Sequence, residues 1–239
     1  MTGSSTEPLR QAAELSRLID VPFDDPALLE KALTHRSWAF EHNAQPNERL
    51  EFLGDAVLAL VVTDEVFHAH PEEQEGRLAK VRSAAVKTGS LASVARHLGL
   101  GRYVKLGRGE AASGGHDKDS ILADTLEAVI GAVYLDRGFA TAYDFVQRLF
   151  GERLADLAEL EAALDYKTSL QELSASRYEQ LPQYVVRDEG PDHEKLFRAE
   201  VQVDGRIVGR GEGRSKKQAE QRAAREAFTA LHDAPDAVG

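Results

Sequence analysis

The sequence predicts an all-α domain followed by a small α+β domain with the order α-β-β-β-α. Three observations lead to this fold class. The chain has 239 residues, more than the roughly 100 to 200 residues of one typical domain. Up to about Leu154, apolar residues recur at spacings of three and four, which is the helical period. Farther on, apolar residues alternate with polar ones, which is typical of strands. We therefore expect a helical domain over 9–155, a linker over 156–165 and a second domain over 166–233.

The helical domain carries recognisable start and stop signals. One helix is expected behind Asp25 and Pro26 in DDPALLEKAL, because Asp caps helices and Pro suits the first turn. Another, in GSLASVARHLGL, is expected to stop at Gly99. The stretch LGRGEAASGGHDKDS predicts a loop, and it leads into an apolar helix over 121–135. Small residues on this helix predict close backbone packing: Ala123, Ala128, Gly131 and Ala132.

The connector and the second domain follow. The run ADLAELEAALDY predicts a short charged connector or a continued helix. TSLQELSASR has the helical pattern, whereas QYVVRDEG and LFRAEVQVDGRIVGRGEG alternate like strands, with Asp204 and Gly205 as a hairpin turn. Ser215 and Gln218 form a capping-box pattern, which predicts where the last helix starts.

Composition excludes several kinds of site. The chain has no cysteine, so it can form neither a disulfide nor a thiolate site, and any metal must be held by oxygen or imidazole. No run approaches the ~18 apolar residues of a membrane helix, so we expect a cytoplasmic protein with no membrane partner.

The net charge of the chain is −11, but residues 166–232 carry 12 Lys and Arg against 11 Asp and Glu. A basic face there must come from clustering.

The stretch NERLEFLGDAV places carboxylates on an otherwise apolar helix. At 100° per residue, Glu48, Glu51 and Asp55 fall within about 60° of one another. Glu51 and Asp55 are one turn apart, about 6 Å along the axis. A second pair, Asp124 and Glu127, interrupts the apolar face of the helix over 121–135. These acids are candidates for a shared cation site.

Two interpretations of these acids stay open on spacing alone. Each carboxylate could be solvated or paired with a neighbour such as Arg49, which is the usual state of an acid on a helix. Two like charges about 5 Å apart, however, repel by about 3 kcal/mol at an effective dielectric of ~20, and a cation removes this cost. Oxygen-only ligands suit a hard ion such as Mg²⁺. The spacing does not establish that the two helices meet.

Several motifs together resemble the ribonuclease III family of double-stranded-RNA endonucleases. NERLEFLGDAV is similar to the family signature, and ALTHRSW, EGRLAKVRSAAV, LGRGEAASGG and SILADTLEAVIGAVYLD resemble its other blocks in the expected order. DYKTSLQEL, GPDHEKLF and GRGEGRSKKQAEQRAA resemble its double-stranded-RNA-binding domain. The resemblance covers the chain from about Leu15 to Leu231 and implies a helical nuclease domain that acts as a homodimer.

The resemblance carries the family's site residues onto this chain. It implies Glu51, Asp124 and Glu127 as metal ligands, and Asp55 and Glu127 as catalytic residues. Glu48 and Glu75 match further acids of the family's acidic cleft. The family signature often has Ser where this chain has Ala56, which is not a ligand. His35 in ALTHRSW has apolar neighbours and is interpreted as structural.

The implied chemistry is hydrolysis of phosphodiester bonds in double-stranded RNA. Two Mg²⁺ ions, or Mn²⁺ in their place, about 4 Å apart would activate water and neutralise the leaving 3′ oxygen. No small-molecule cofactor is implied. The family's products carry a 5′ phosphate and a 3′ hydroxyl with a two-nucleotide 3′ overhang, and its substrates include ribosomal and messenger RNA precursors.

The resemblance also implies contacts with RNA and with a second subunit. The expected RNA contacts are Gln171, Glu172, Pro191, His193, Lys216 and Lys217. The two lysines stand at the start of the last helix, where free backbone N–H groups and the helix dipole favour phosphate. Phe52 matches an aromatic residue that docks into the partner subunit, although core packing is the usual role of such a Phe.

Two rival functions are disfavoured by the residues of the chain. A non-cleaving RNA-binding protein of the same fold is disfavoured because all four acids, Glu51, Asp55, Asp124 and Glu127, are present. A DNA nuclease is disfavoured because the second domain suits A-form duplexes.

Overall fold

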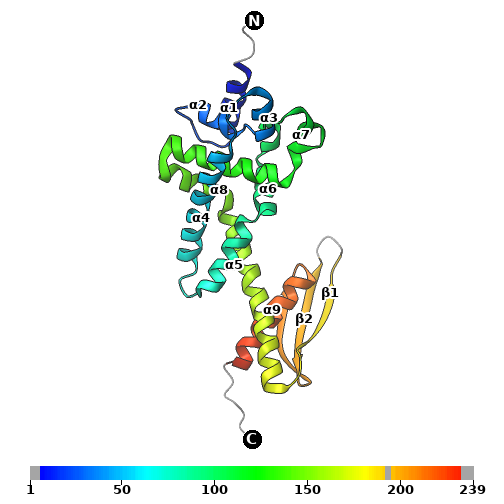
Figure 1. Cartoon of the computed structure of the whole chain (residues 1–239). Helices are drawn as coiled ribbons and strands as arrows, with labels where there is room; N and C mark the ends of the chain where they lie inside the picture. Colours follow the sequence, from blue (N-terminus) through cyan, green and yellow to red (C-terminus); the bar gives the residue numbers. More distant parts are fainter. Residues whose placement is uncertain (1–5, 192–194, 233–239) are drawn as a thin grey trace. The chain divides into compact units, whose positions relative to one another are not determined.

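The computed structural model describes residues 6–191 and 195–232, without the side chains of residues 6–9 and 158–165. The chain divides into two compact units, Met1–Leu157 and Ala158–Gly239. The first is helical and the second contains the sheet (Figure 1). The predicted fold class is therefore confirmed.

The first unit is built from helices that carry its core. In chain order these are α1 (Thr6–Leu18), α2 (Pro26–Ala32), α3 (Arg36–His42), α4 (Glu48–Ala69), α5 (Glu75–Val86), α6 (Thr88–His97), η1 (Leu100–Tyr103), α7 (Arg108–Ala112), η2 (Gly115–Asp117) and the first part of α8 (Asp119–Tyr178).

Local sequence signals account for several helix ends. The carboxylate of Asp25 accepts a hydrogen bond of 3.0 Å from the N–H of Ala27 and caps α2, as predicted. Helix α6 ends at His97, two residues before Gly99, whose φ of +65° is unfavourable for other residues. Gly138, with φ 79° and ψ 177°, divides α8 into two helices.

One expectation was wrong in part. The segment predicted as a loop contains the short helix α7 and the single turn η2. Helix α7 begins where the carboxylate of Glu41 accepts a 2.9 Å hydrogen bond from the N–H of Arg108. This cap comes from a residue far away in the sequence, so the local composition of the segment did not indicate it.

Helices α4 and α8 cross with their backbones in contact, and this crossing positions the candidate site. A Cβ atom on Gly54 would lie 1.7 Å from the carbonyl oxygen of Glu127, and one on Gly131 would lie 2.3 Å from that of Leu50. Around the crossing, Val57, Leu58, Leu126 and Ile130 are buried. The close packing predicted from small residues on the second helix is confirmed, and its partner on α4 is Gly54.

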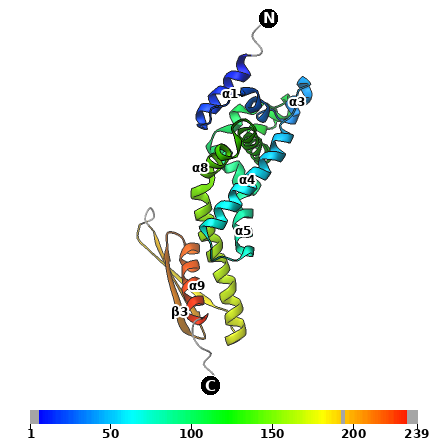
Figure 2. The same ribbon diagram turned by 90° about the vertical axis from the view of Figure 1, so that its left-hand side faces the viewer.

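The second unit is a three-stranded antiparallel sheet covered by helices, with the strand order β1-β2-β3. Its elements are the last part of α8, β1 (Gln183–Glu189), β2 (Leu196–Val203), β3 (Arg206–Gly213) and α9 (Lys216–His232). Figure 2 shows α9 lying along the sheet. The residues of the predicted linker, 156–165, are helical.

The local signals predicted for the second unit are confirmed. Asp204 and Gly205 form the turn between β2 and β3, with φ angles of 49° and 71°. The hydroxyl of Ser215 accepts a 3.2 Å hydrogen bond from the N–H of Gln218 at the start of α9. Alternate residues of β3 are glycines, and a Cβ atom on Gly211 would lie 2.3 Å from the carbonyl oxygen of Ala219. The helix therefore packs directly on the strand.

Across the described residues, no helix combines the length and the apolar character that a membrane span requires.

The crossing predicts the effect of adding one methyl group. Gly54→Ala should destabilise the protein by about 1–3 kcal/mol or more, because two packed backbones must separate. Gly151→Ala is the control, since a Cβ atom there meets no atom within 4 Å and alanine favours a helix. Urea denaturation measures both variants. Equal stability of Gly54→Ala and Gly151→Ala would contradict the close crossing.

Candidate metal centre and nucleic-acid interface

Three carboxylates from α4 and α8 converge at the crossing. Glu51 lies in the first turn of α4, and Asp124 and Glu127 lie one turn apart on α8. Each offers an oxygen atom, and these oxygens all lie within 4.8 Å of one another. All three side chains are half-buried. The structure thus brings together the three residues that the resemblance implied as metal ligands.

The electrostatics of this group disfavour negative charge. Burial, followed in order by the charges of Asp55, Asp124 and Glu51, raises the pKa of Glu127 to about 8. Burial also raises the pKa of Glu51, followed by the charge of Asp124. The pKa of Asp124 is raised by burial, against the effect of His35. A cation would offset the repulsion, and an all-oxygen ligand set suits a hard divalent ion.

The other predicted acids take different places. Asp55 is exposed and close enough to Glu127 for its charge to raise that pKa. Glu48 is exposed and lines the same cleft as Glu51. Glu75, the first residue of α5, instead lines a separate hollow of about 170 Å³ that also contains Phe67. Within one chain, therefore, Glu75 is not part of the carboxylate cluster.

A cleft of about 470 Å³ opens beside the cluster. Its lining residues are His35, Arg36, Asn47, Glu48, Glu51, Glu110, Lys118, Ser120, Ile121 and Asp124. Asn47, which precedes α4, is buried and anchors this end of the helix. Its N–H donates to the carbonyl of Thr34 at 2.9 Å, and its side-chain nitrogen donates to the carbonyl of Ala32 at 3.1 Å. These bonds fix the turn that carries Glu48 and Glu51.

The cleft also contains groups that the sequence did not assign to the site. Lys118 forms an ion pair with Glu110, so η2 and α7 are tied together on one wall. Arg36, from α3, adds a second cation. Both cations could face a polyanion beside the cluster. The sequence does indicate Lys118, with His116, as a candidate RNA contact in the Gly-rich segment directly before the helix that carries Asp124 and Glu127.

Those predicted RNA-binding residues of the second unit that the structure describes are on its surface. Gln171 and Glu172 are exposed on α8, and Pro191 is exposed after β1. His193 lies outside the described residues. Lys216 and Lys217 are exposed in the first turn of α9.

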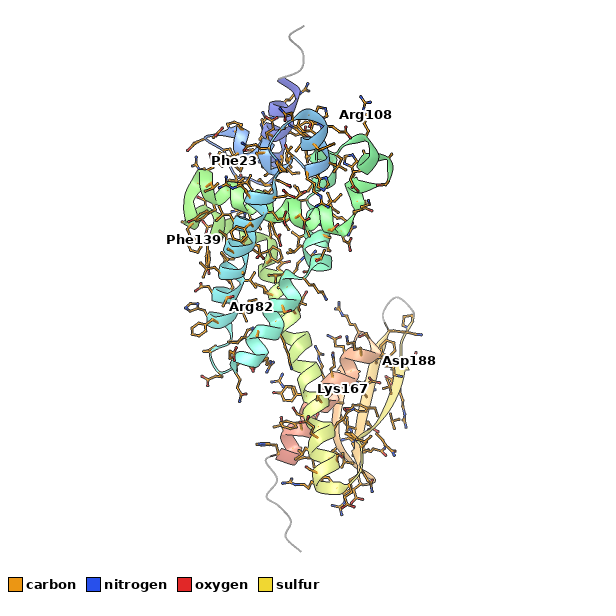
Figure 3. The ribbon with its side chains drawn as sticks, in the orientation of Figure 1. Phe23, Arg82, Arg108, Phe139, Lys167 and Asp188 are labelled. Carbon is orange, nitrogen blue, oxygen red and sulfur yellow. The ribbon has the colours of Figure 1, made fainter. Side chains whose placement is uncertain are left out.

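The helices of the second unit are fixed to each other beneath these side chains. Lys167, labelled in Figure 3, reaches Glu220 of α9 at 2.7 Å. The rings of Tyr166 and Phe228 pack with their centroids 5.8 Å apart. The two helices therefore present their exposed residues from one rigid unit.

Phe52 projects from α4 on the opposite side from the core. Its side chain is 81% exposed, and Leu60 and Phe67 on the same helix are 56% and 62% exposed. At 100° per residue the three directions fall within about 80° of one another. Phe52 is therefore not a core residue of the single chain, and α4 carries an apolar stripe formed by Phe52, Leu60 and Phe67.

Comparison with known proteins agrees with both units. Residues 25–154 match the family model described as Ribonuclease-III-like, and residues 166–231 match the double-stranded RNA binding motif. The protein named Ribonuclease 3 from Thermobifida fusca is 59% identical over 212 residues, covering 88% of each chain. That of Mycobacterium leprae is 54% identical over 230 residues, covering 95% of each chain.

A solved structure is similar to the first unit. The nuclease domain of ribonuclease III from Campylobacter jejuni superposes with a TM-score of 0.56 at 43% identity, covering 58% of this chain and 95% of that one. In that nuclease domain, a region involved in dimer formation is structurally flexible.

The carboxylate cluster predicts a pH-dependent effect on stability. Because the pKa of Glu127 rises from 4.5 to about 8, this group favours the folded state at low pH and progressively loses that contribution as the pH rises to about 8. Without divalent cations at pH 9, Glu127→Gln should be more stable than the wild type by at least ~1.4 kcal/mol, the equivalent of one pKa unit.

The difference between the two proteins should shrink toward pH 5, and a divalent cation at pH 9 should stabilise the wild type more than the variant. Urea denaturation in a chelator, with Glu152→Gln as an exposed control on α8, measures this. A stability difference that does not change with pH would contradict the cluster.

Proposed function

This chain belongs to the ribonuclease III family of double-stranded-RNA-specific endoribonucleases, and from that premise we propose a Mg²⁺-dependent hydrolysis that leaves 5′-phosphate and 3′-hydroxyl ends. The observation that carries the proposal is the convergence of Glu51, Asp124 and Glu127 within 4.8 Å. Such a set of hard oxygen ligands, open to a cleft, suits a cation that keeps positions for water and phosphate.

The acidic residues of the site have different proposed roles. Glu51, Asp124 and Glu127 would hold the metal, with Mn²⁺ as an alternative to Mg²⁺. When bound, such ions supply a water nucleophile at neutral pH and neutralise charge on a leaving oxygen. Asp55, exposed beside Glu127, would orient the attacking water. The bond between phosphorus and the 3′ oxygen breaks, so the phosphate stays on the 5′ end of the downstream product.

The second unit would supply the affinity for duplex RNA. Domains of this fold span about 16 bp and contact two minor grooves and the phosphates between them. Lys216 and Lys217 start α9, where the helix dipole adds to their charge. Gln171, Glu172, Pro191 and His193 are proposed to contact the minor grooves. Such contacts recognise duplex shape, so this unit would select the substrate class and leave the position of the cut to other contacts.

A homodimer would cover the apolar stripe on α4. Phe52 of one subunit is proposed to enter the hollow of the other, which Val66, Leu78 and Ala79 line together with Glu75. Arg82, labelled on α5 in Figure 3, also lines this hollow. Docking Phe52 there would remove exposed apolar surface from water.

The dimer also gives the proposed products their form. Two active sites would each cut one strand, leaving two-nucleotide 3′ overhangs.

We extend the proposal to structured precursors of ribosomal and messenger RNA. These substrates would place the enzyme in the cytoplasm, where bacterial RNA is made.

Removing one carboxylate tests the proposed chemistry. Glu127→Ala should lower cleavage of a long RNA duplex in Mg²⁺ by at least about 10³-fold, because one ligand of the ion is lost, while duplex affinity changes little. Gel analysis of the products and their ends measures cleavage, and a binding assay in a chelator measures affinity. Glu152→Ala, an exposed position on α8 beyond Gly138, should cleave normally. Wild-type-like cleavage by Glu127→Ala would refute the metal assignment.

Truncating the exposed aromatic side chain tests the dimer. Phe52→Ala should shift the protein toward monomer in analytical ultracentrifugation, because the subunit contact loses its largest apolar group. Phe40→Ala is the matched control, since Phe40 is 91% exposed but lies on α3. If both variants sediment like the wild type, the stripe on α4 is not the interface.

A further inference from the structure

His35 lines the cleft, and the mechanism above does not use it. The backbone N–H of His35 donates to the carbonyl of Lys105 at 3.2 Å, and the residue caps α3 with φ −68° and ψ 150°. The backbone of His35 is therefore held from two sides. The imidazole is half-buried and lines the same cleft as Glu51 and Asp124.

The contacts of Nδ1 determine where the ring carries its proton. The N–H of Ser37 donates to Nδ1 at 3.3 Å, and the hydroxyl of Ser37 lies 2.8 Å from the same nitrogen. That hydroxyl already accepts a hydrogen bond of 2.9 Å from the N–H of Gly107, so its own hydrogen is available for Nδ1. Nδ1 is therefore an acceptor, and a neutral ring carries its proton on Nε2.

Glycine at position 107 allows this arrangement. A Cβ atom there would lie 2.8 Å from the carbonyl oxygen of Ser37 and 2.6 Å from the carboxylate of Glu41. A larger residue would push the segment before α7 away from α3. The bond from Gly107 to Ser37, and with it the orientation of the hydroxyl, depends on this close approach.

The remaining ring nitrogen, Nε2, has no hydrogen-bond partner among the described residues. Burial lowers the pKa of His35, which keeps the ring neutral in a cleft that also contains carboxylates. Nε2–H is thus a donor with a fixed direction, present before any substrate arrives. Donors organised in advance stabilise charge that develops on a substrate.

We propose that His35 donates its Nε2–H to a non-bridging phosphate oxygen of the RNA strand in the cleft. This inference rests on the proposed function and adds a substrate contact on the wall formed by α3. Of the carboxylates in the cleft, Glu51 and Asp124 would be engaged by the cation and Glu110 is paired with Lys118. Glu48 is exposed to solvent, so we assign the incoming phosphate as the acceptor of this donor. Arg36 and Lys118 line the same cleft and favour a phosphate there.

Substitutions at position 35 separate the donor from the helix cap. In His35→Asn the amide oxygen can replace Nδ1 as the cap of α3, because Asn is a preferred capping residue, but no group replaces Nε2–H. His35→Gln places an amide nearer to the position of Nε2. The experiment measures single-turnover cleavage of duplex RNA in Mg²⁺, duplex affinity in a chelator, and melting temperature.

We expect His35→Asn to keep the melting temperature and duplex affinity of the wild type and to cleave about 100-fold more slowly, as the loss of one preorganised donor predicts. His35→Gln should cleave faster than His35→Asn. Wild-type cleavage by His35→Asn would overturn the inference, because the residue would then be only a cap. An equal loss of affinity and rate would overturn it as well.

A second variant covers the case in which His35→Asn is unstable. Ser37→Ala leaves the imidazole in place but removes the hydroxyl that orients it, so cleavage should slow several-fold at unchanged duplex affinity. An unchanged cleavage rate would overturn the inference. Failure of the wild type itself to cleave would instead refute the proposed function, so the two failures can be distinguished.

Discussion

The crossing of α4 and α8 is the constraint on which the site depends. Gly54 and Gly131 have no side chains, so the two backbones touch where Glu51 faces Asp124 and Glu127. A methyl group at either glycine would overlap a carbonyl oxygen of the other helix. Carboxylates from two separate segments can share one ion only when the segments lie this close. The buried apolar residues around the crossing keep the two helices together despite the repulsion between the carboxylates.

The electrostatics and the architecture assign different tasks to the two units. In the first unit, burial and like charge raise the pKa of Glu127 to about 8, so negative charge on this cluster has an electrostatic cost that a bound cation would offset. In the second unit, Lys216 and Lys217 remain exposed on a compact sheet-and-helix scaffold. In the proposed function, duplex affinity would come from this second unit, so the acidic cluster need not attract RNA by itself.

The sequence predicted what local chemistry determines. The Asp25 cap, the turn at Asp204 and Gly205, and the Ser215 capping box are short-range interactions, and all three are present. It could not show that α4 and α8 meet, because that contact joins segments more than 70 residues apart; the resemblance filled this gap.

Features that depend on tertiary contacts were missed. Helix α7 begins at a cap supplied by Glu41. The structural role expected for His35 agrees with its cap on α3, but the contact between Ser37 and the distant Gly107 that orients its ring could not be seen in the sequence.

The convergence of the three carboxylates on one cation is tested most directly by a crystal structure with Mn²⁺, in which anomalous scattering locates the ion. We expect a Mn²⁺ peak about 2.2 Å from oxygens of Glu51, Asp124 and Glu127. A Mn²⁺ peak bound elsewhere, with these three carboxylates apart, would contradict it.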